Sequence, residues 1–135
     1  MATFNKVNAF VENVAEKVFN LGSDSLKVAL TNTAHTSTWS KLSDLTEVSY
    51  TNLSSRAITT TSSAQTSGTY KLVLADLTLT ASGSVGPFQY VYLYDDTASN
   101  KELIGYYDYG SAVTLSNGDL FIIDFDGTNG VLTIA

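Results

Sequence analysis

An apolar repeat runs through the first 21 residues of the chain and predicts a helix. Apolar residues recur there at steps of three and four, with polar residues at most positions between them: Phe4, Val7, Val11, Val14, Val18 and Leu21. This spacing places the apolar side chains on one face of a helix. Thr3 can cap the N-terminus of this helix, and Gly22 can adopt the left-handed conformation that ends a helix. We therefore expect an amphipathic helix over about residues 3–21 that packs on the domain's own sheet, with packing against a partner helix as the alternative.

Beyond Gly22 the apolar period changes to two, which is the period of a strand. Leu26, Val28 and Leu30 alternate with polar or smaller residues. After a Ser/Thr-rich loop at 32–45, short strand-like runs separated by turn residues follow at 47–51, 56–62, 69–75, 77–82, 87–95, 102–107, 112–116, 119–125 and 131–134. A single open sheet would leave one face of so many strands uncovered. The chain is therefore predicted to be mainly β, with one domain over residues 1–135 that combines an N-terminal amphipathic α-helix with an antiparallel, jelly-roll-like β-sandwich over about residues 25–135.

The clearest turn signal is Asn117–Gly118, which lies between two of these runs. Both residue types tolerate the positive φ angles of a tight hairpin turn. Residues 112–116 and 119–125 are therefore expected to pair as a hairpin. The single proline, Pro87, follows a glycine and marks the entry to the run at 87–95.

Composition indicates a folded, β-rich domain and limits the classes of partner that it could bind. Apolar residues make up 44% of the chain and charged residues 15%, while 18 Thr, 8 Tyr and 6 Phe favour strands. The net charge of −6 argues against nucleic acid, because only seven basic residues are present and they are scattered. Because the chain lacks a long apolar run, we expect neither a signal peptide nor a membrane partner. It also lacks cysteine, which excludes disulfides and thiolate chemistry.

No pattern in the sequence predicts catalysis or a resident metal, and we expect no cofactor. His35, the one histidine, lies in a polar loop without a Gly-x-Ser-x-Gly motif, and we interpret it as a loop residue. The C-terminal third holds seven acidic residues, from which a glycosidase pair could be drawn, but they flank turns, where Asp is favoured by local hydrogen bonding. Residues 124–130 resemble the start of a calcium loop, yet they lack the later glutamate, and we interpret them as a turn between strands.

Six of the eight tyrosines lie between residues 90 and 109. Tyr90, Tyr92 and Tyr94 share one face of a strand whose other face is also apolar, so this strand is either central in the sandwich or half of it meets a partner. Core packing, a protein interface and carbohydrate stacking all remain open from the sequence. The residues considered for partner binding are Phe10, Phe19, Trp39, Tyr90, Tyr92, Tyr94, Tyr106, Tyr107 and Tyr109.

Several segments resemble small structural proteins of tailed bacteriophages and prophages. They are FNKVNAFVENVAEKV at 4–18, LKVALTNTA at 26–34, QTSGTYKLVL at 65–74, GPF at 86–88, LIGYYDYG at 103–110 and NGVLTI at 129–134. The resemblance spans nearly the whole chain. It departs from the pattern at His35, where these proteins usually have proline after Asn-Thr-Ala, and this affects only the conformation of the loop.

The resemblance implies a non-enzymatic virion protein, most often a decoration or cement protein of the head. Such a protein binds and stabilises the lattice of the major capsid protein on the outer head surface, after assembly in the bacterial cytoplasm. A homo-oligomer is expected, with a dimer favoured because two-fold contacts are the commonest. A tail or baseplate component and a glycan-binding module are the alternatives. For a cement protein, we expect the acidic turns of residues 95–135 to face solvent or a basic capsid patch, while neutral surfaces carry the apolar contacts.

Overall fold

The computed structural model describes residues 2–135, and its regular elements are nearly all strands. The helical elements are the α-helix α1 (Phe10–Ala15) and the 3-10 turn η1 (Leu42–Asp44). The strands are β1 (Phe4–Lys6), β2 (Leu26–Thr31), β3 (Ala57–Ile58), β4 (Thr60–Thr66), β5 (Thr69–Leu74), β6 (Leu77–Thr80), β7 (Val85–Asp95), β8 (Leu103–Leu115), β9 (Leu120–Ile123) and β10 (Leu132–Ile134). Within residues 2–135, no helix has the length and apolar character needed to cross a membrane.

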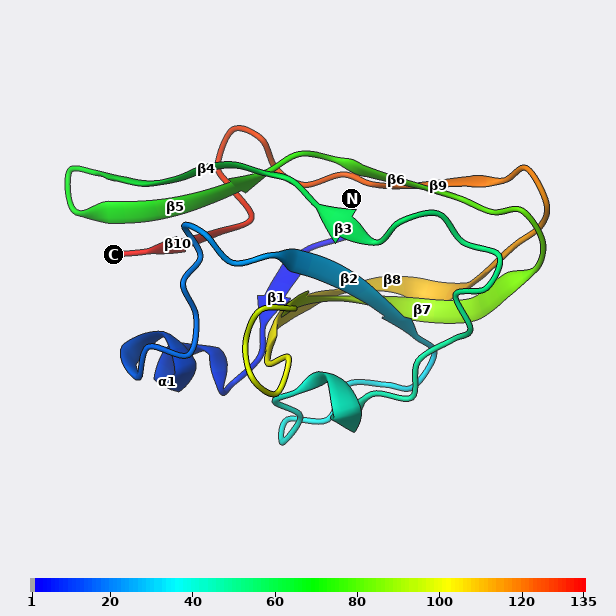
Figure 1. Ribbon diagram of the computed structural model, residues 1–135, viewed down its shortest axis with the longest axis horizontal. Coiled ribbons are helices and arrows are strands. Elements are labelled where there is room, and N and C mark those ends of the chain that lie inside the picture. Colours follow the sequence, from blue (N-terminus) through cyan, green and yellow to red (C-terminus); the bar gives the residue numbers. More distant parts are fainter. Residues whose placement is uncertain (1) are drawn as a thin grey trace.

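The strands form three antiparallel sheets arranged in two layers (Figure 1). The large sheet has the order β1-β8-β7-β2-β3, and the small sheets have the orders β10-β5-β4 and β6-β9. Figure 1 shows the small sheets above the large one, and side chains join the layers: the rings of Phe88 on β7 and Phe121 on β9 meet edge to face at 5.1 Å. The prediction of a mainly β, antiparallel domain with one helix is confirmed. The two layers are compatible with a sandwich, whereas the jelly-roll connectivity stays a prediction.

β7 is the central strand of the large sheet, which explains its apolar residues on both faces. It pairs with β2 on one side and with β8 on the other. Leu93 lies opposite Val28 and faces the small sheets, while Tyr92 lies opposite Ala29 on the other face. Both Leu93 and Tyr92 are buried. Of the two arrangements expected for this strand, the central one is therefore observed.

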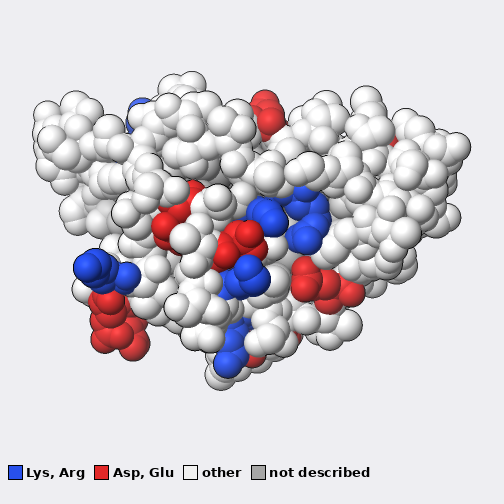
Figure 2. Space-filling model, in the orientation of Figure 1, with Lys and Arg blue, Asp and Glu red and all other residues white. Residues whose placement is uncertain are grey.

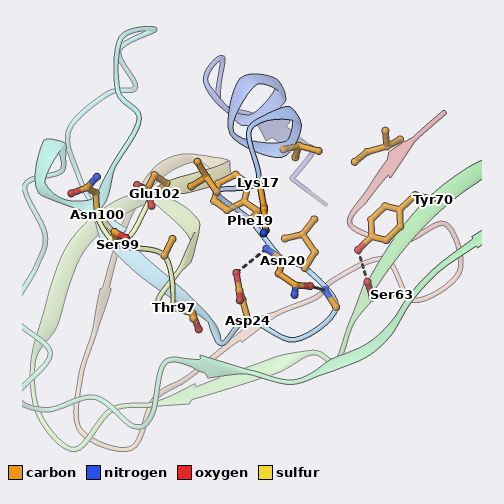
Figure 3. A pocket seen from close by; sticks show the side chains of 16 residues that line it. Lys17, Phe19, Asn20, Asp24, Ser63, Tyr70, Thr97, Ser99, Asn100 and Glu102 are labelled. Carbon is orange, nitrogen blue, oxygen red and sulfur yellow. Dashed lines mark hydrogen bonds between the residues drawn. The ribbon is translucent and has the colours of Figure 1, made fainter.

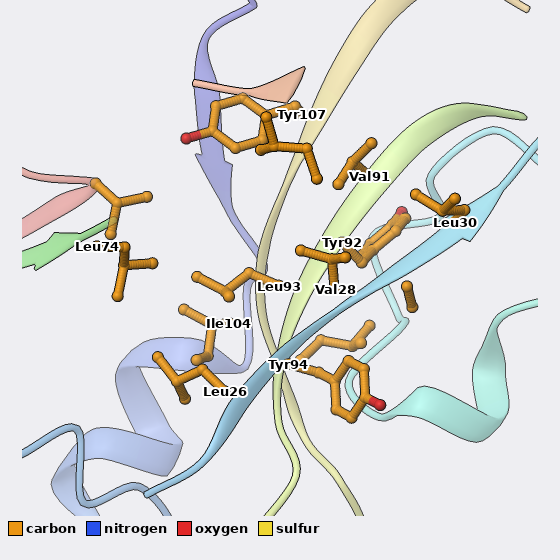
Figure 4. Close-up of a cluster of buried hydrophobic side chains, with 14 of the residues drawn as sticks. Leu26, Val28, Leu30, Leu74, Val91, Tyr92, Leu93, Tyr94, Ile104 and Tyr107 are labelled. Carbon is orange, nitrogen blue, oxygen red and sulfur yellow. The ribbon is translucent and has the colours of Figure 1, made fainter. Parts of the chain in front are cut away.

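The core occupies the space between the layers and continues onto the tyrosine face of β7 (Figure 4). Its largest fully buried side chains are Tyr92, Tyr94, Phe10, Phe88, Leu26, Leu30, Leu72, Leu79, Leu93, Leu103, Ile104 and Ile123. They come from α1 and from strands of both layers. Burial of each such side chain contributes about 1.5–3 kcal/mol, so this cluster supplies most of the drive to fold.

The N-terminal helix is much shorter than the prediction over residues 3–21. Residues Phe4–Lys6 form β1 against β8, where the rings of Phe4 and Tyr107 lie 5.3 Å apart. The chain leaves the helix through Lys17, whose φ of 65° is left-handed. Valine and asparagine are frequent in this segment and are weak helix formers. Pairing with the edge of β8 therefore prevails over the helical pattern, and Val11 of the expected apolar face is 61% exposed.

Most predicted strand runs are confirmed, but the connections differ in three places. The runs at 102–107 and 112–116 join into the single strand β8, and residues 47–51 form no strand beyond one bridge between Glu47 and Thr31. The hairpin predicted at Asn117–Gly118 is wrong, because β8 pairs with β7 and β9 pairs with β6. The turn instead links the two layers: the Gly118 N–H donates to the carbonyl of Ala81 at 2.8 Å and directs the chain to β6.

Candidate functional site

Five of the nine aromatic residues considered for partner binding lie inside the protein. They are Phe10, Phe19, Tyr92, Tyr94 and Tyr107, and all are buried. Phe10 and Phe19 stack on each other with ring centroids 5.7 Å apart, because the segment after α1 folds back along the helix. These five side chains are therefore part of the core and not of a contact surface. The other four, Trp39, Tyr90, Tyr106 and Tyr109, are half-buried.

An aromatic cluster covers the outer face of β7 and β8. The His35 ring stacks on Tyr106 with centroids 4.3 Å apart, and its Nδ1 lies 2.7 Å from the hydroxyl of Tyr92. Trp39 meets the His35 ring edge-on at 5.8 Å, and Tyr90 lies 6.5 Å from Tyr106. Burial lowers the pKa of His35, which favours the neutral imidazole at neutral pH. The cluster holds the loop at 32–45 on the sheet, and Trp39, Tyr90 and Tyr106 remain partly open to solvent.

The polar segment 47–56 covers the part of the large sheet's outer face that lies next to the aromatic cluster. The Arg56 guanidinium lies over the ring of Tyr50 at 3.7 Å and donates to the carbonyl of Val28 at 2.7 Å. The Tyr50 hydroxyl donates to Glu47 at 2.7 Å and accepts from the N–H of Leu30 at 2.9 Å. Segment 47–56 therefore contributes a cover for β2, although it forms no strand.

A cavity of about 940 Å³ opens between the segment after α1, the small sheet β10-β5-β4 and the loop joining β7 to β8 (Figure 3). Its apolar wall includes Phe19 and Leu21, and its polar wall includes Asp24, Tyr70 and Glu102. The cavity therefore brings carboxyl groups from distant parts of the chain to one end of the molecule. The sequence contains no local motif for it.

Asp24 in the wall of this cavity forms a carboxyl pair with Asp95 behind it. Asp95, at the end of β7, is fully buried, and its Oδ1 accepts the N–H groups of Thr97 and Ala98 at 3.0 and 3.2 Å. Its Oδ2 is buried and has no hydrogen-bond partner, and the Asp24 carboxyl group is a neighbour. Burial, together with the neighbouring Asp24, raises the pKa of Asp95 to about 7. The Asp24 carboxyl group, in the segment after α1, therefore favours the protonated form of Asp95 at the end of β7.

This carboxyl pair predicts a pH-dependent stability. The folded protein holds the Asp95 proton up to about pH 7, whereas the unfolded chain releases it near its ordinary pKa of 3.8. Folded protein therefore binds the extra proton between these values, and stability falls as the pH rises through this window and then levels off. We expect the urea midpoint to be higher at about pH 5 than at about pH 8.

The Asp95→Asn variant separates this effect from the other titrating groups. Asparagine keeps the oxygen that accepts from Thr97 and Ala98 and offers an N–H to Asp24, so the variant should lose the pH dependence and gain stability at the alkaline end. Asp96→Asn is the matched control, because the carboxylate of Asp96 lies 2.7 Å from Lys101, which lowers its pKa and moves it out of this window. Equal pH profiles for wild type and Asp95→Asn would contradict the role of Asp95.

Two other acidic residues of the C-terminal third, Asp119 and Asp126, have the turn roles predicted for them. Asp126 accepts the N–H groups of Thr128 and Asn129 at 2.9 and 2.8 Å, and the Asn129 side chain donates to its second oxygen at 3.0 Å. Asp119 accepts from the N–H of Ser116 at 2.8 Å. The interpretation of 124–130 as a turn is confirmed, since both Asp126 oxygens are engaged by their own loop. Among residues 2–135, no group of three or more His, Asp or Glu side chains is arranged to hold a metal ion.

The most exposed apolar pair lies on the outer face of β9, and neither residue is among those predicted for partner binding. Leu120 and Ile122 are 60% and 57% exposed, while Phe121 and Ile123 between and after them face the core. Across the ladder, Leu120 lies opposite Thr80 and Ile122 lies opposite Thr78 on β6. We call Leu120 and Ile122 the apolar β9 surface. The unbroken apolar run 120–123 is the signal that could have indicated it, because such a strand is apolar on both faces.

Comparisons of the chain with protein-family models, with curated proteins and with solved structures find no match.

Proposed function

We propose that this protein is a structural component of a tailed-phage virion, a capsid decoration protein that binds the lattice of the major capsid protein through the apolar β9 surface. The observation that carries the proposal is the exposure of two large aliphatic side chains side by side on a strand that is anchored in the core. Contiguous exposed apolar side chains are typical of contact sites. The resemblance of the chain to small phage structural proteins supports the choice of partner.

The apolar β9 surface is rigid and has an acidic border. β9 is held by its ladder with β6, and Phe121 packs edge-on against Phe88 and against Tyr109 at 5.1 and 5.2 Å. Such preorganisation lowers the entropic cost of binding. Asp119 and Asp124 flank the strand and are exposed. The complementary capsid surface is therefore an apolar patch bordered by basic residues.

This placement differs from the expected separation of acidic turns and apolar contacts. The apolar β9 surface lies within residues 95–135, which hold the excess of negative charge. Apolar and ionic contacts would therefore act on the same surface. Burial of the aliphatic pair supplies affinity, whereas the acidic border speeds association and sets specificity. High salt should slow association with the capsid without detaching protein that is already bound.

Sedimentation of the purified protein with particles that lack it tests the proposed surface. Leu120→Ser and Ile122→Ser should each weaken binding about tenfold, because each removes one aliphatic side chain from the contact. Val11→Ser is the control, since Val11 is equally exposed but lies on α1. The surface is the wrong one if all three variants bind as wild type does, or if Val11→Ser causes the same loss.

The cementing role makes a prediction for the particle itself. Heads that carry the wild-type protein should survive heating or osmotic shock better than heads that lack it, since a bound clamp stabilises the assembled state by mass action. Heads offered the Leu120→Ser, Ile122→Ser double variant should behave like undecorated heads. Release of packaged DNA measures the difference. Equal survival with and without the wild-type protein would contradict cementing and leave only passive attachment.

The aromatic cluster favours glycan binding as a second candidate function. Trp39, Tyr90 and Tyr106 are half-buried members of this cluster, and aromatic rings that are open to solvent can stack on sugar rings. A glycan array with wild type and Trp39→Ala checks this candidate. Binding that the variant loses would support it, and an array without a binder would exclude it.

A further inference from the structure

We infer that the free edge of β4 pairs with β4 of a second copy of this chain, antiparallel and across a two-fold axis. The observation is that β4, with seven residues, is the longest strand at a sheet edge in the described structure. It lies outermost in the order β10-β5-β4. This inference is independent of the capsid role, because it rests on a different part of the molecule.

The backbone of β4 is open along its outer side. In an antiparallel pair, alternate residues direct their N–H and C=O groups toward the partner strand, and the others direct theirs away. β4 pairs with β5 from Thr60 to Thr66, and in the described part of the chain no backbone hydrogen bond joins it to any other strand. The β4–β5 hairpin turns tightly at Ser67 and Gly68, both with positive φ, and its tip extends from one end of the upper layer (Figure 1). The row of free groups is therefore accessible.

The side chains of β4 lack the features that protect sheet edges. Natural edge strands carry charged residues or proline, are short, or are covered. The seven residues of β4 are Thr, Thr, Ser, Ser, Ala, Gln and Thr. In the space-filling view, the part of the molecule that holds β4 and β5 is almost free of charged atoms (Figure 2). A single register irregularity between Thr60 and Ser62 interrupts only the start of the strand.

The other edges of the described sheets are protected. β1, β3 and β10 have three, two and three residues, and β1 includes Lys6. β9 has four residues and is flanked by Asp119 and Asp124. β6 is covered by the preceding segment, in which the Ser54 N–H donates to the carbonyl of Thr80 at 3.0 Å. The contrast singles out β4 as the edge left available.

A second copy of the chain is the occupant that fits this edge. A strand paired antiparallel with itself is self-complementary, and two-fold dimers are the commonest oligomers. The molecule carries a net charge of −6, so two copies repel over most of their surfaces, but β4 itself is uncharged and brings no like charges into register. Opposed Thr and Ser hydroxyls also stabilise such pairs. The dimer would continue β10-β5-β4 into one sheet of six strands.

Sedimentation equilibrium of the full chain tests the inference with two variants that add the same charge. Ala64 and Thr133 both lie opposite Lys71, Ala64 on β4 and Thr133 on β10 at the other edge of the sheet. Ala64→Glu should raise the dissociation constant of the dimer about tenfold, because it places a carboxylate near its copy across the axis. Thr133→Glu should leave the constant unchanged. Each glutamate faces Lys71, so neither variant loses monomer stability, which thermal unfolding checks.

A charge-complementation experiment completes the test. Ala64→Lys alone should also weaken the dimer, whereas a mixture of Ala64→Glu and Ala64→Lys should restore it, since opposite charges then meet across the axis. A wild-type chain that stays monomeric up to millimolar concentration would overturn the inference. So would a dimer that Thr133→Glu weakens as much as Ala64→Glu does, or a mixture that shows no recovery.

Discussion

Replacement of Phe88 by alanine should lower the free energy of unfolding by about 3–5 kcal/mol. Phe88 is fully buried, and its ring meets Phe121 of the other layer at 5.1 Å. The substitution removes the apolar contacts of the ring and leaves a cavity between two sheets that cannot close without moving a whole layer. Urea unfolding followed by tryptophan fluorescence and by circular dichroism measures the loss.

Leu120→Ala is the matched control for Phe88→Ala. It truncates an apolar residue on β9, next to the Phe121 that Phe88 contacts, but the side chain is 60% exposed, so the change should stay within about 0.5 kcal/mol. The m-value should not change in either variant if both unfold as one cooperative unit. A loss of similar size at the two positions would mean that the layers do not pack as described.

Gly105→Ala should destabilise the protein by about 1–3 kcal/mol and detach β1 from β8. A β-carbon at this position would lie 2.5 Å from the carbonyl oxygen of Asn5 and would overlap the ring of Phe4. The backbone of β1 cannot give way without losing its register, in which Lys6 pairs with Gly105. Hydrogen exchange of the β1 amides should rise more than exchange in β2, because the strain is local.

A second glycine provides the control for Gly105→Ala. Gly127 has no heavy atom within 4 Å of an added β-carbon and no positive φ, so Gly127→Ala should be neutral or slightly stabilising. A double variant that combines Gly105→Ala with Phe4→Ala should recover only part of the loss, since the clash with the Asn5 carbonyl remains. Full stability of Gly105→Ala would show that β1 is not seated on β8.

The strands that build the centre of the fold could be predicted, because their apolar pattern agrees with their burial. The alternation at Leu26, Val28 and Leu30 matches β2, and the doubly apolar run around Leu93 matches the central strand β7. Local pattern and tertiary contact indicate the same structure at these positions. The same agreement explains why the class, antiparallel and mainly β, follows from the sequence.

The structure of the N-terminal segment could not be predicted from its pattern, because the same apolar residues can be buried in two different structures. Steps of three and four suit a helix, but Val7 and Phe10 are also buried when the chain runs as β1, a turn and α1. The open edge of β8 decides between them, and that edge exists only after the sheet has formed. The wrong hairpin at Asn117–Gly118 has a similar cause, because a turn's residues fix its φ angles but not the layer to which the next strand goes.

The candidate functional residues show the same limit. The tyrosine pattern left core packing, a protein interface and carbohydrate stacking open. Tyr92 and Tyr94 are buried beneath the segments at 32–45 and 47–56, which carry few strand signals of their own. The raised pKa of Asp95 depends on burial and on Asp24, a residue far away in the chain. Leu120 and Ile122 became candidates only when the structure showed which face of β9 is open.

Electron cryo-microscopy of particles that carry this protein tests the central claim most directly. We expect density for the protein on the outer head surface, repeated with the capsid lattice, with Leu120 and Ile122 of β9 turned toward the major capsid protein. Density restricted to the tail, or a head-bound protein whose β9 face points to solvent, would contradict it.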